Sequence, residues 1–228
     1  MSARPPGGPT MAGMPGTSSA ALKIGWVLGW AVPEVWFGPL ARTAFPMATH
    51  TFVPAAPDAL ARLEAAGPFD WVAGYSLGSL LLLVDSARAE RLGRVVLLAP
   101  IFAFLREHDR GGRMARAQVR LLARWLRRDP MAALADFYGR AGLVVPSSEA
   151  PDEKVEDLNW GLERLENAVA PPALPAGWCA WCGADDPLID VARLRALAPE
   201  ISIVPGATHH PAALLRAFAG MIPTTNLR

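Results

Sequence analysis

The chain has 228 residues, of which 52% are hydrophobic and 19% are charged, and its formal net charge is +1. This length and composition suit one α/β domain with a full core. The near-neutral charge excludes a global electrostatic field that would select one class of partner, although local charge can still do so. No apolar run approaches the roughly 18 residues that span a membrane, so no membrane span is expected.

Two features bear on the cellular setting. Residues 1–20 are rich in Pro, Gly, Ser and Met and contain no apolar run, which predicts a disordered tail rather than a signal peptide. Cys179 and Cys182 form a lone Cys-x-x-Cys inside an apolar, strand-like run, without further ligands at metal spacing. We therefore expect buried thiols, no metal or other cofactor, and a cytoplasmic location.

The first half of the domain alternates between strand and helix patterns. In chain order the expected elements are a strand at 21–28, a helix at 34–44, a strand at 47–53, a helix at 57–66, a strand at 71–73, a helix from 80–84 and a strand at 94–100. This alternation predicts a mostly parallel, doubly wound sheet. Trp36 and His50, within these elements, are interpreted as structural residues.

The sequence Gly74-Tyr75-Ser76-Leu77-Gly78 lies where the third strand gives way to a helix. Gly-x-Ser-x-Gly in this context is the pattern of a nucleophile elbow, a sharp turn that raises the serine above the sheet. The glycines are needed because strand and helix pass too closely for side chains at those positions. Ser76 is thus the predicted nucleophile.

The oxyanion hole is expected beside Ser76. The N–H of Leu77 opens the helix after the elbow, where partial positive charge favours an anion. Hydrolases of this type take a second donor from the loop after an early strand. That loop is 29–33 here, and the backbone N–H of Trp30 is the candidate.

Residues 101–170 break the strand–helix alternation and predict an inserted helical cap. Residues 106–128 hold eight arginines, and several recur at intervals of three and four, which places them along one stripe of a helix. The stripe used for the binding prediction consists of Arg113, Arg116, Arg120 and Arg124. A solvated face and a docking surface for an acidic partner are equally compatible with it. Nucleic acid is not expected, because Trp125 is the sole aromatic residue interleaved with the arginines.

The alternation resumes after the cap with strands expected at 177–182 and 201–205. The turn after the first of these contains Asp185 and Asp186, and the loop after the second contains His209 and His210. The order Ser, Asp, His is the hydrolase-fold order, in which the carboxylate orients the imidazole and the imidazole takes the serine proton. The residues alone leave each pair ambiguous by one position.

The chain resembles the α/β-hydrolase superfamily and, within it, the pimeloyl-[acyl-carrier protein] methyl ester esterases of biotin synthesis. The stretches that carry the resemblance are 28–30 with 34–36, 74–78, 157–165 (Asp-Leu-Asn-Trp-Gly-Leu-Glu-Arg-Leu), and the turns at 183–189 and 206–209. The resemblance spans residues 21–228 and implies the α/β-hydrolase fold. It favours Asp186 and His209 as acid and base, and the Trp30 and Leu77 N–H groups as the oxyanion hole.

The chain also departs from the family pattern. Leu28-Gly29 stands where His-Gly is usual, and the N-terminus leaves room only for a trimmed sheet. The reaction implied is hydrolysis of the methyl ester of a pimeloyl chain on its acyl carrier protein, with the basic cap as docking site. The alternatives are a small-molecule carboxylesterase or thioesterase of the same fold, and a non-catalytic scaffold that binds an acidic partner.

Overall fold

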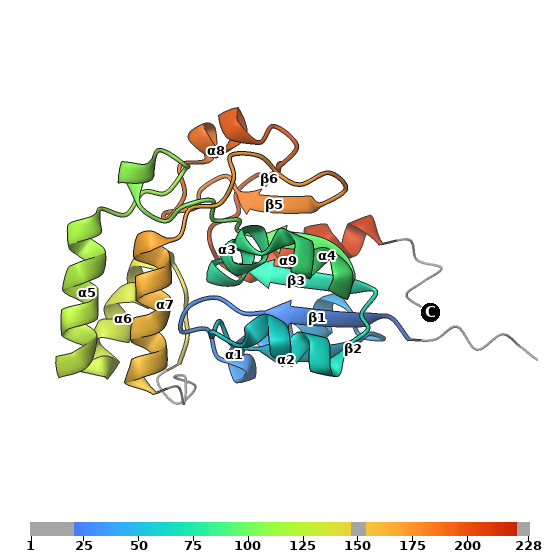
Figure 1. The fold of residues 1–228 in the computed structure, drawn as a ribbon, viewed down its shortest axis with the longest axis horizontal. Coiled ribbons are helices and arrows are strands. Elements are labelled where there is room, and N and C mark those ends of the chain that lie inside the picture. Colours follow the sequence, from blue (N-terminus) through green and yellow to red (C-terminus); the bar gives the residue numbers. More distant parts are fainter. Residues whose placement is uncertain (1–20, 147–153, 223–228) are drawn as a thin grey trace, which may run out of the picture.

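A six-stranded, entirely parallel sheet forms the centre of the molecule (Figure 1). The computed structural model describes residues 21–146 and 154–222, so the tail predicted at 1–20 lies outside the described residues. The strands, in chain order, are β1 (Lys23–Val27), β2 (Thr49–Val53), β3 (Trp71–Tyr75), β4 (Arg94–Leu98), β5 (Cys179–Gly183) and β6 (Ser202–Val204). Their spatial order is β2-β1-β3-β4-β5-β6, which confirms the predicted doubly wound sheet.

Helices cover both faces of this sheet. The helices of the sheet region are α1 (Glu34–Ala44), α2 (Ala59–Ala66), α3 (Leu77–Val84), α4 (Ser86–Leu92), α8 (Val191–Leu197) and α9 (Pro211–Met221). Helices α1 and α9 pack together on one face, and α2, α3 and α4 pack on the other. Because the central strands are covered on both faces, β3 is apolar and buried along its whole length rather than alternating.

Three helices connect β4 to β5 and lie beyond the carboxyl ends of the strands (Figure 1). They are α5 (Arg116–Arg128), α6 (Pro130–Ala141) and α7 (Val155–Asn167), and a short 3₁₀ turn, Arg106–His108, precedes them. We call α5, α6 and α7 the cap. Asp129 begins α6 by accepting a hydrogen bond from the Ala132 N–H, with Pro130 at the first helical position, and Gly142 ends it with a φ of 67°.

The prediction that Arg113 shares a helical stripe with the later arginines is wrong. Helix α5 begins only at Arg116. The residues before it are drawn out by two isolated bridges, from Leu105 to Met114 and from Gly112 to Ile189. These backbone pairings override a helical periodicity that the sequence continues by chance.

Two further expectations can be compared with the described residues. Cys182 is fully buried and its thiol pKa is raised by burial, whereas Cys179 is half-buried, and both are free thiols. None of the described helices is long and apolar enough to cross a membrane.

Candidate active site

Ser76 lies in the sharp turn between β3 and α3. Its backbone has φ 54° and ψ −117°, a conformation that L-residues rarely adopt. Its N–H donates to the carbonyl of Leu98 on the neighbouring strand β4, at 3.0 Å, which joins the turn to the sheet. The strained serine is therefore fixed in place at the carboxyl end of the central strands.

The two glycines of the elbow are required by close approaches of the backbone. A Cβ on Gly78 would lie 2.0 Å from the carbonyl oxygen of Val27, and one on Gly74 would lie 2.8 Å from Gly78 O. Both neighbours are main-chain atoms, so neither contact could be relieved by a change of rotamer. The spacing of glycines in Gly-x-Ser-x-Gly is thus explained by the crossing of β3, α3 and β1.

Ser76, His209 and Asp186 form a continuous hydrogen-bonded chain. His209 Nε2 lies 3.0 Å from Ser76 Oγ, and His209 Nδ1 lies 2.7 Å from Asp186 Oδ2. The other carboxylate oxygen, Oδ1, accepts from the Leu188 N–H at 2.9 Å, which fixes the plane of the carboxylate. All three side chains are buried, with Ser76 7% exposed and the other two 1% exposed. This arrangement can deprotonate the serine hydroxyl and stabilise the resulting imidazolium.

The other residue of each ambiguous pair, Asp185 or His210, makes its contacts outside the chain of Ser76, His209 and Asp186. Asp185 is exposed, and its N–H bonds to the Ala207 carbonyl in the neighbouring loop. His210 is the N-cap of α9, where its Nδ1 accepts from the Ala212 N–H at 3.3 Å. Partial burial, helped by the charge of Arg216, lowers the pKa of His210. These contacts make Asp185 a turn residue and His210 a capping residue.

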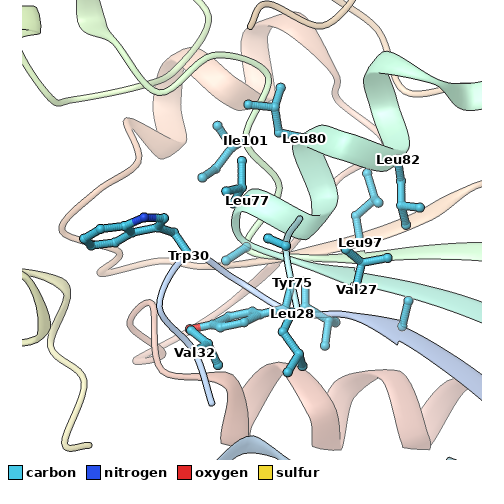
Figure 2. Close-up of a cluster of buried hydrophobic side chains, with 14 of the residues drawn as sticks. Val27, Leu28, Trp30, Val32, Tyr75, Leu77, Leu80, Leu82, Leu97 and Ile101 are labelled. Atoms are coloured by element: carbon cyan, nitrogen blue, oxygen red, sulfur yellow. The ribbon is translucent and has the colours of Figure 1, made fainter. Parts of the chain in front are cut away.

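The loop after β1 lies against the serine, as the sequence suggested. A Cβ placed on Gly29 would meet Ser76 Cβ at 3.1 Å, so the backbone leading to Trp30 passes directly beside Ser76. Leu77 is the first residue of α3, and its N–H therefore has no hydrogen-bond acceptor within that helix. Figure 2 shows Trp30 and Leu77 within the buried apolar cluster around the ends of β1 and β3.

Sequence reasoning missed two polar residues that hold the elbow and the histidine loop. Tyr75 Oη donates to the His209 carbonyl at 2.8 Å, and burial, together with the charge of Asp186, raises the pKa of this phenol well above its ordinary value. Ser79 Oγ donates to the Ser76 carbonyl at 2.5 Å and accepts from the Ile101 N–H at 2.9 Å. Tyr75 occupies a position that the motif leaves open and Ser79 lies one residue beyond the motif, so the sequence carried no signal for them.

The cap contacts the loop after β1 through the Trp30 side chain. The indole Nε1 donates to the carbonyl of Leu158 in α7 at 2.7 Å, and the ring packs edge-on against Phe137 in α6 with centroids 4.6 Å apart. A Cβ on Gly161 would lie 2.4 Å from Trp30 Cδ1, so only glycine fits at that position of α7. The stretch 157–165 that carries the family resemblance therefore forms the seat of the Trp30 indole.

The four predicted carrier-binding arginines have three different environments. Arg113 is exposed, and one guanidinium nitrogen lies 3.5 Å from the backbone carbonyl of Asp186. Arg116 and Arg120 both pair with Glu166 of α7, at 3.1 and 2.7 Å. Arg124 is exposed and forms no ion pair with any described residue. Half of the predicted stripe is thus engaged in joining α5 to α7.

An apolar pocket lies between α5 and α6. Its lining residues are Met114, Gln118, Leu121, Leu122, Trp125, Asp136, Phe137, Arg140 and Leu188. Two of these lining residues also contact residues of the site: the Leu188 N–H donates to Asp186, and the Phe137 ring packs against Trp30. Within the described ranges, no group of three or more His, Cys, Asp or Glu residues could hold a metal ion.

Comparison with solved structures shows a shared fold. No protein-family model and no curated protein matches the chain. Among solved structures, the esterase RhEst1 from a Rhodococcus species is 19% identical, with 90% of this chain and 93% of that chain covered and a TM-score of 0.61. The bottromycin epimerase BotH is 16% identical over 90% and 92% of the two chains, with a TM-score of 0.62.

An α/β hydrolase from Sphaerobacter thermophilus is 19% identical over 89% of this chain and 93% of that chain, with a TM-score of 0.52. At such identities the likeness concerns the fold alone, and one fold here includes an esterase and an epimerase, so the reaction has to be argued from the site. Together with the parallel sheet and the elbow between β3 and α3, these likenesses show that the chain has the α/β-hydrolase fold.

Proposed function

We propose that this protein is a serine carboxylesterase whose substrate is the methyl ester of pimeloyl-acyl-carrier protein, a precursor of biotin. The observation that carries the reaction type is the buried hydrogen-bonded chain from Ser76 through His209 to Asp186. An elbow serine paired with an imidazole and a buried carboxylate is the arrangement that acyl transfer requires.

The reaction follows from this geometry. Ser76 Oγ attacks the ester carbonyl carbon while His209 Nε2 takes its proton. The N–H groups of Trp30 and Leu77 stabilise the oxyanion, and the imidazolium then protonates the departing methanol. A water molecule, deprotonated by His209, attacks the acyl-enzyme and releases the free carboxylate together with the serine. Asp186 orients the imidazole and stabilises the imidazolium.

Two features support an acyl chain on a carrier protein as the substrate class. The pocket between α5 and α6 is mostly apolar, which suits a hydrocarbon chain, and one of its lining residues, Leu188, donates its N–H to Asp186. The exposed arginines at the end of α5 suit the acidic surface that carrier proteins present. The resemblance of stretch 157–165 to the pimeloyl esterases points to the same substrate.

The serine mechanism is tested by Ser76→Ala. Because this change removes the nucleophile and the elbow backbone tolerates alanine, we expect kcat for p-nitrophenyl butyrate to fall by about 10⁴-fold or more, with an unchanged melting temperature. His209→Ala should be as damaging, whereas His210→Ala should cost little activity. Substantial turnover by purified Ser76→Ala would contradict the serine mechanism.

Carrier docking is tested by reversing the charges of Arg124, Arg127 and Arg128, which are exposed. We expect kcat/KM for methyl-pimeloyl carrier protein, followed by intact mass, to fall about 10-fold or more, because surface charges mainly set the association rate. Hydrolysis of p-nitrophenyl butyrate should not change.

The matched control reverses the charges of Arg116 and Arg120, which pair with Glu166. This control should weaken the cap and affect both substrates. Equal losses on both substrates in the Arg124/Arg127/Arg128 variant would contradict docking. Unchanged kinetics on the carrier substrate would favour a small-molecule carboxylesterase or thioesterase instead.

A further inference from the structure

The turn that carries the Trp30 N–H has a strained backbone. It runs from Gly29 to Val32 and is closed by a hydrogen bond from the Val32 N–H to the Gly29 carbonyl, at 3.3 Å. Its third residue, Ala31, has a φ of 54°, in the left-handed region, and is buried. A non-glycine residue held there costs about 1–2 kcal/mol, so the turn would relax unless neighbouring groups hold it.

A tyrosine from the cap holds this turn. Tyr138 Oη, on α6, donates to the carbonyl oxygen of Ala31 at 2.6 Å, in a buried environment. The two residues are 107 positions apart in sequence. Because Ala31 is itself 1% exposed, its carbonyl would have no access to water if the hydroxyl were removed. The hydrogen bond therefore opposes the relaxation of a backbone that is strained at the same residue.

We propose that Tyr138 is a positioning residue for the oxyanion hole. Its hydroxyl holds Ala31 in the left-handed conformation, and this keeps the neighbouring Trp30 N–H directed at the position where the ester oxygen becomes negative. The proposal rests on the serine-esterase function proposed above. It assigns the cap a part in assembling the site, in addition to binding the acyl chain.

The reasoning predicts a distinct kinetic signature. A misplaced oxyanion donor weakens binding of the transition state and leaves binding of the ground state nearly unchanged. Tyr138→Phe keeps the ring and removes only the hydroxyl. We expect its kcat for p-nitrophenyl butyrate to fall about 10- to 100-fold, with KM changed less than about 2-fold. Inhibition by butylboronic acid, whose tetrahedral serine adduct occupies the same hole, should weaken by a similar factor.

A second substitution tests the proposed cause. Glycine adopts positive φ at no steric cost, so Ala31→Gly should make the turn independent of the tether. In the Tyr138→Phe background, Ala31→Gly should restore most of the lost kcat. A purely structural role for Tyr138 gives no reason for such a rescue.

Trp36→Phe is the matched control for a lost contact between sheet region and cap. It removes the hydrogen bond from Trp36 Nε1 to the Val144 carbonyl (2.9 Å) and leaves the turn untouched. We expect a comparable decrease in melting temperature with little change in kcat. If Tyr138→Phe keeps the wild-type kcat while Ser76→Ala is inactive, the inference about Tyr138 is wrong and the serine mechanism stands. A failure of Ala31→Gly to restore kcat in the Tyr138→Phe background would have the same meaning. Turnover that survives Ser76→Ala would refute the serine mechanism and this inference with it.

Discussion

Gly161 in α7 offers a quantitative test of how tightly the cap is fitted to the site. A methyl group at this position would lie 2.4 Å from Trp30 Cδ1 and 3.0 Å from Trp30 Nε1. The indole cannot move away freely, because it is 3% exposed, bonded to the Leu158 carbonyl and packed against Phe137. Gly161→Ala should therefore displace Trp30 and the turn that carries its N–H.

The expected change in the free energy of unfolding of Gly161→Ala follows from two opposing effects. Replacing glycine by alanine inside a helix stabilises it by about 1 kcal/mol. Overpacking a buried site by one methyl group costs about 1–3 kcal/mol. Gly139 in α6 isolates the first effect, because a Cβ there would meet no heavy atom within 4 Å. We expect Gly139→Ala to raise the free energy of unfolding and Gly161→Ala to lie about 1–3 kcal/mol below it.

The two variants are compared by urea denaturation and by kcat on p-nitrophenyl butyrate. Displacement of the oxyanion donor should lower the kcat of Gly161→Ala by about 10- to 100-fold, whereas Gly139→Ala should keep the wild-type rate. If both variants gain the same stability and keep full activity, Trp30 yields without cost and the tight fit is not functional. If stability falls and kcat does not, the seat of Trp30 stabilises the cap without positioning the donor.

Two further predictions concern the acid and the half-buried His50. Asp186→Asn should lower kcat by about 10³- to 10⁴-fold, because His209 would lose its orienting carboxylate. Asp185→Asn, at an exposed position, should have a small effect. The reverse pattern would show that the acid lies one residue earlier. His50 accepts from Trp26 Nε1 at 2.9 Å, and its pKa is lowered by burial despite the hydrogen bond to the Phe45 carbonyl. His50 therefore binds a proton more readily in the unfolded state than in the folded state. The free energy of unfolding should decrease as the pH falls from about 6.5 through the folded-state pKa. Urea titrations at several pH values measure this decrease. His50→Gln should remove part of this dependence, and an identical pH profile in the variant would contradict it.

Local patterns in the sequence determined the framework of this protein. The apolar strand runs, their alternation with helices and the glycines around Ser76 predict the parallel sheet and the turn between β3 and α3. These features can be read from the sequence because they leave local patterns, namely continuous apolar runs in strands buried on both faces and glycines at positions 74 and 78, where no space exists for a Cβ. The same strand pattern places Ser76, the aspartates and the histidines, in this chain order, in the turns that follow predicted strands.

Only the tertiary structure decided how side chains meet across long distances. The residue pattern alone leaves Asp185 and Asp186 open, and only the resemblance favours Asp186, because the difference depends on a hydrogen bond between the turn after β5 and the Ala207 carbonyl in another loop. Nor can it show that Glu166 engages Arg116 and Arg120, since that pairing requires α7 to pack beside α5. Each of these outcomes is set by contacts between segments far apart in the chain.

The loop after β1 illustrates the same division. Its position after an early strand singled out the Trp30 N–H, but nothing in residues 29–32 indicates that Ala31 takes a positive φ. That conformation is stabilised by Tyr138, 107 residues away, and the Trp30 indole is held by Leu158, 128 residues away. Local propensity disfavours such a backbone, and the packing of the cap against the loop supplies hydrogen bonds from distant residues that oppose this preference.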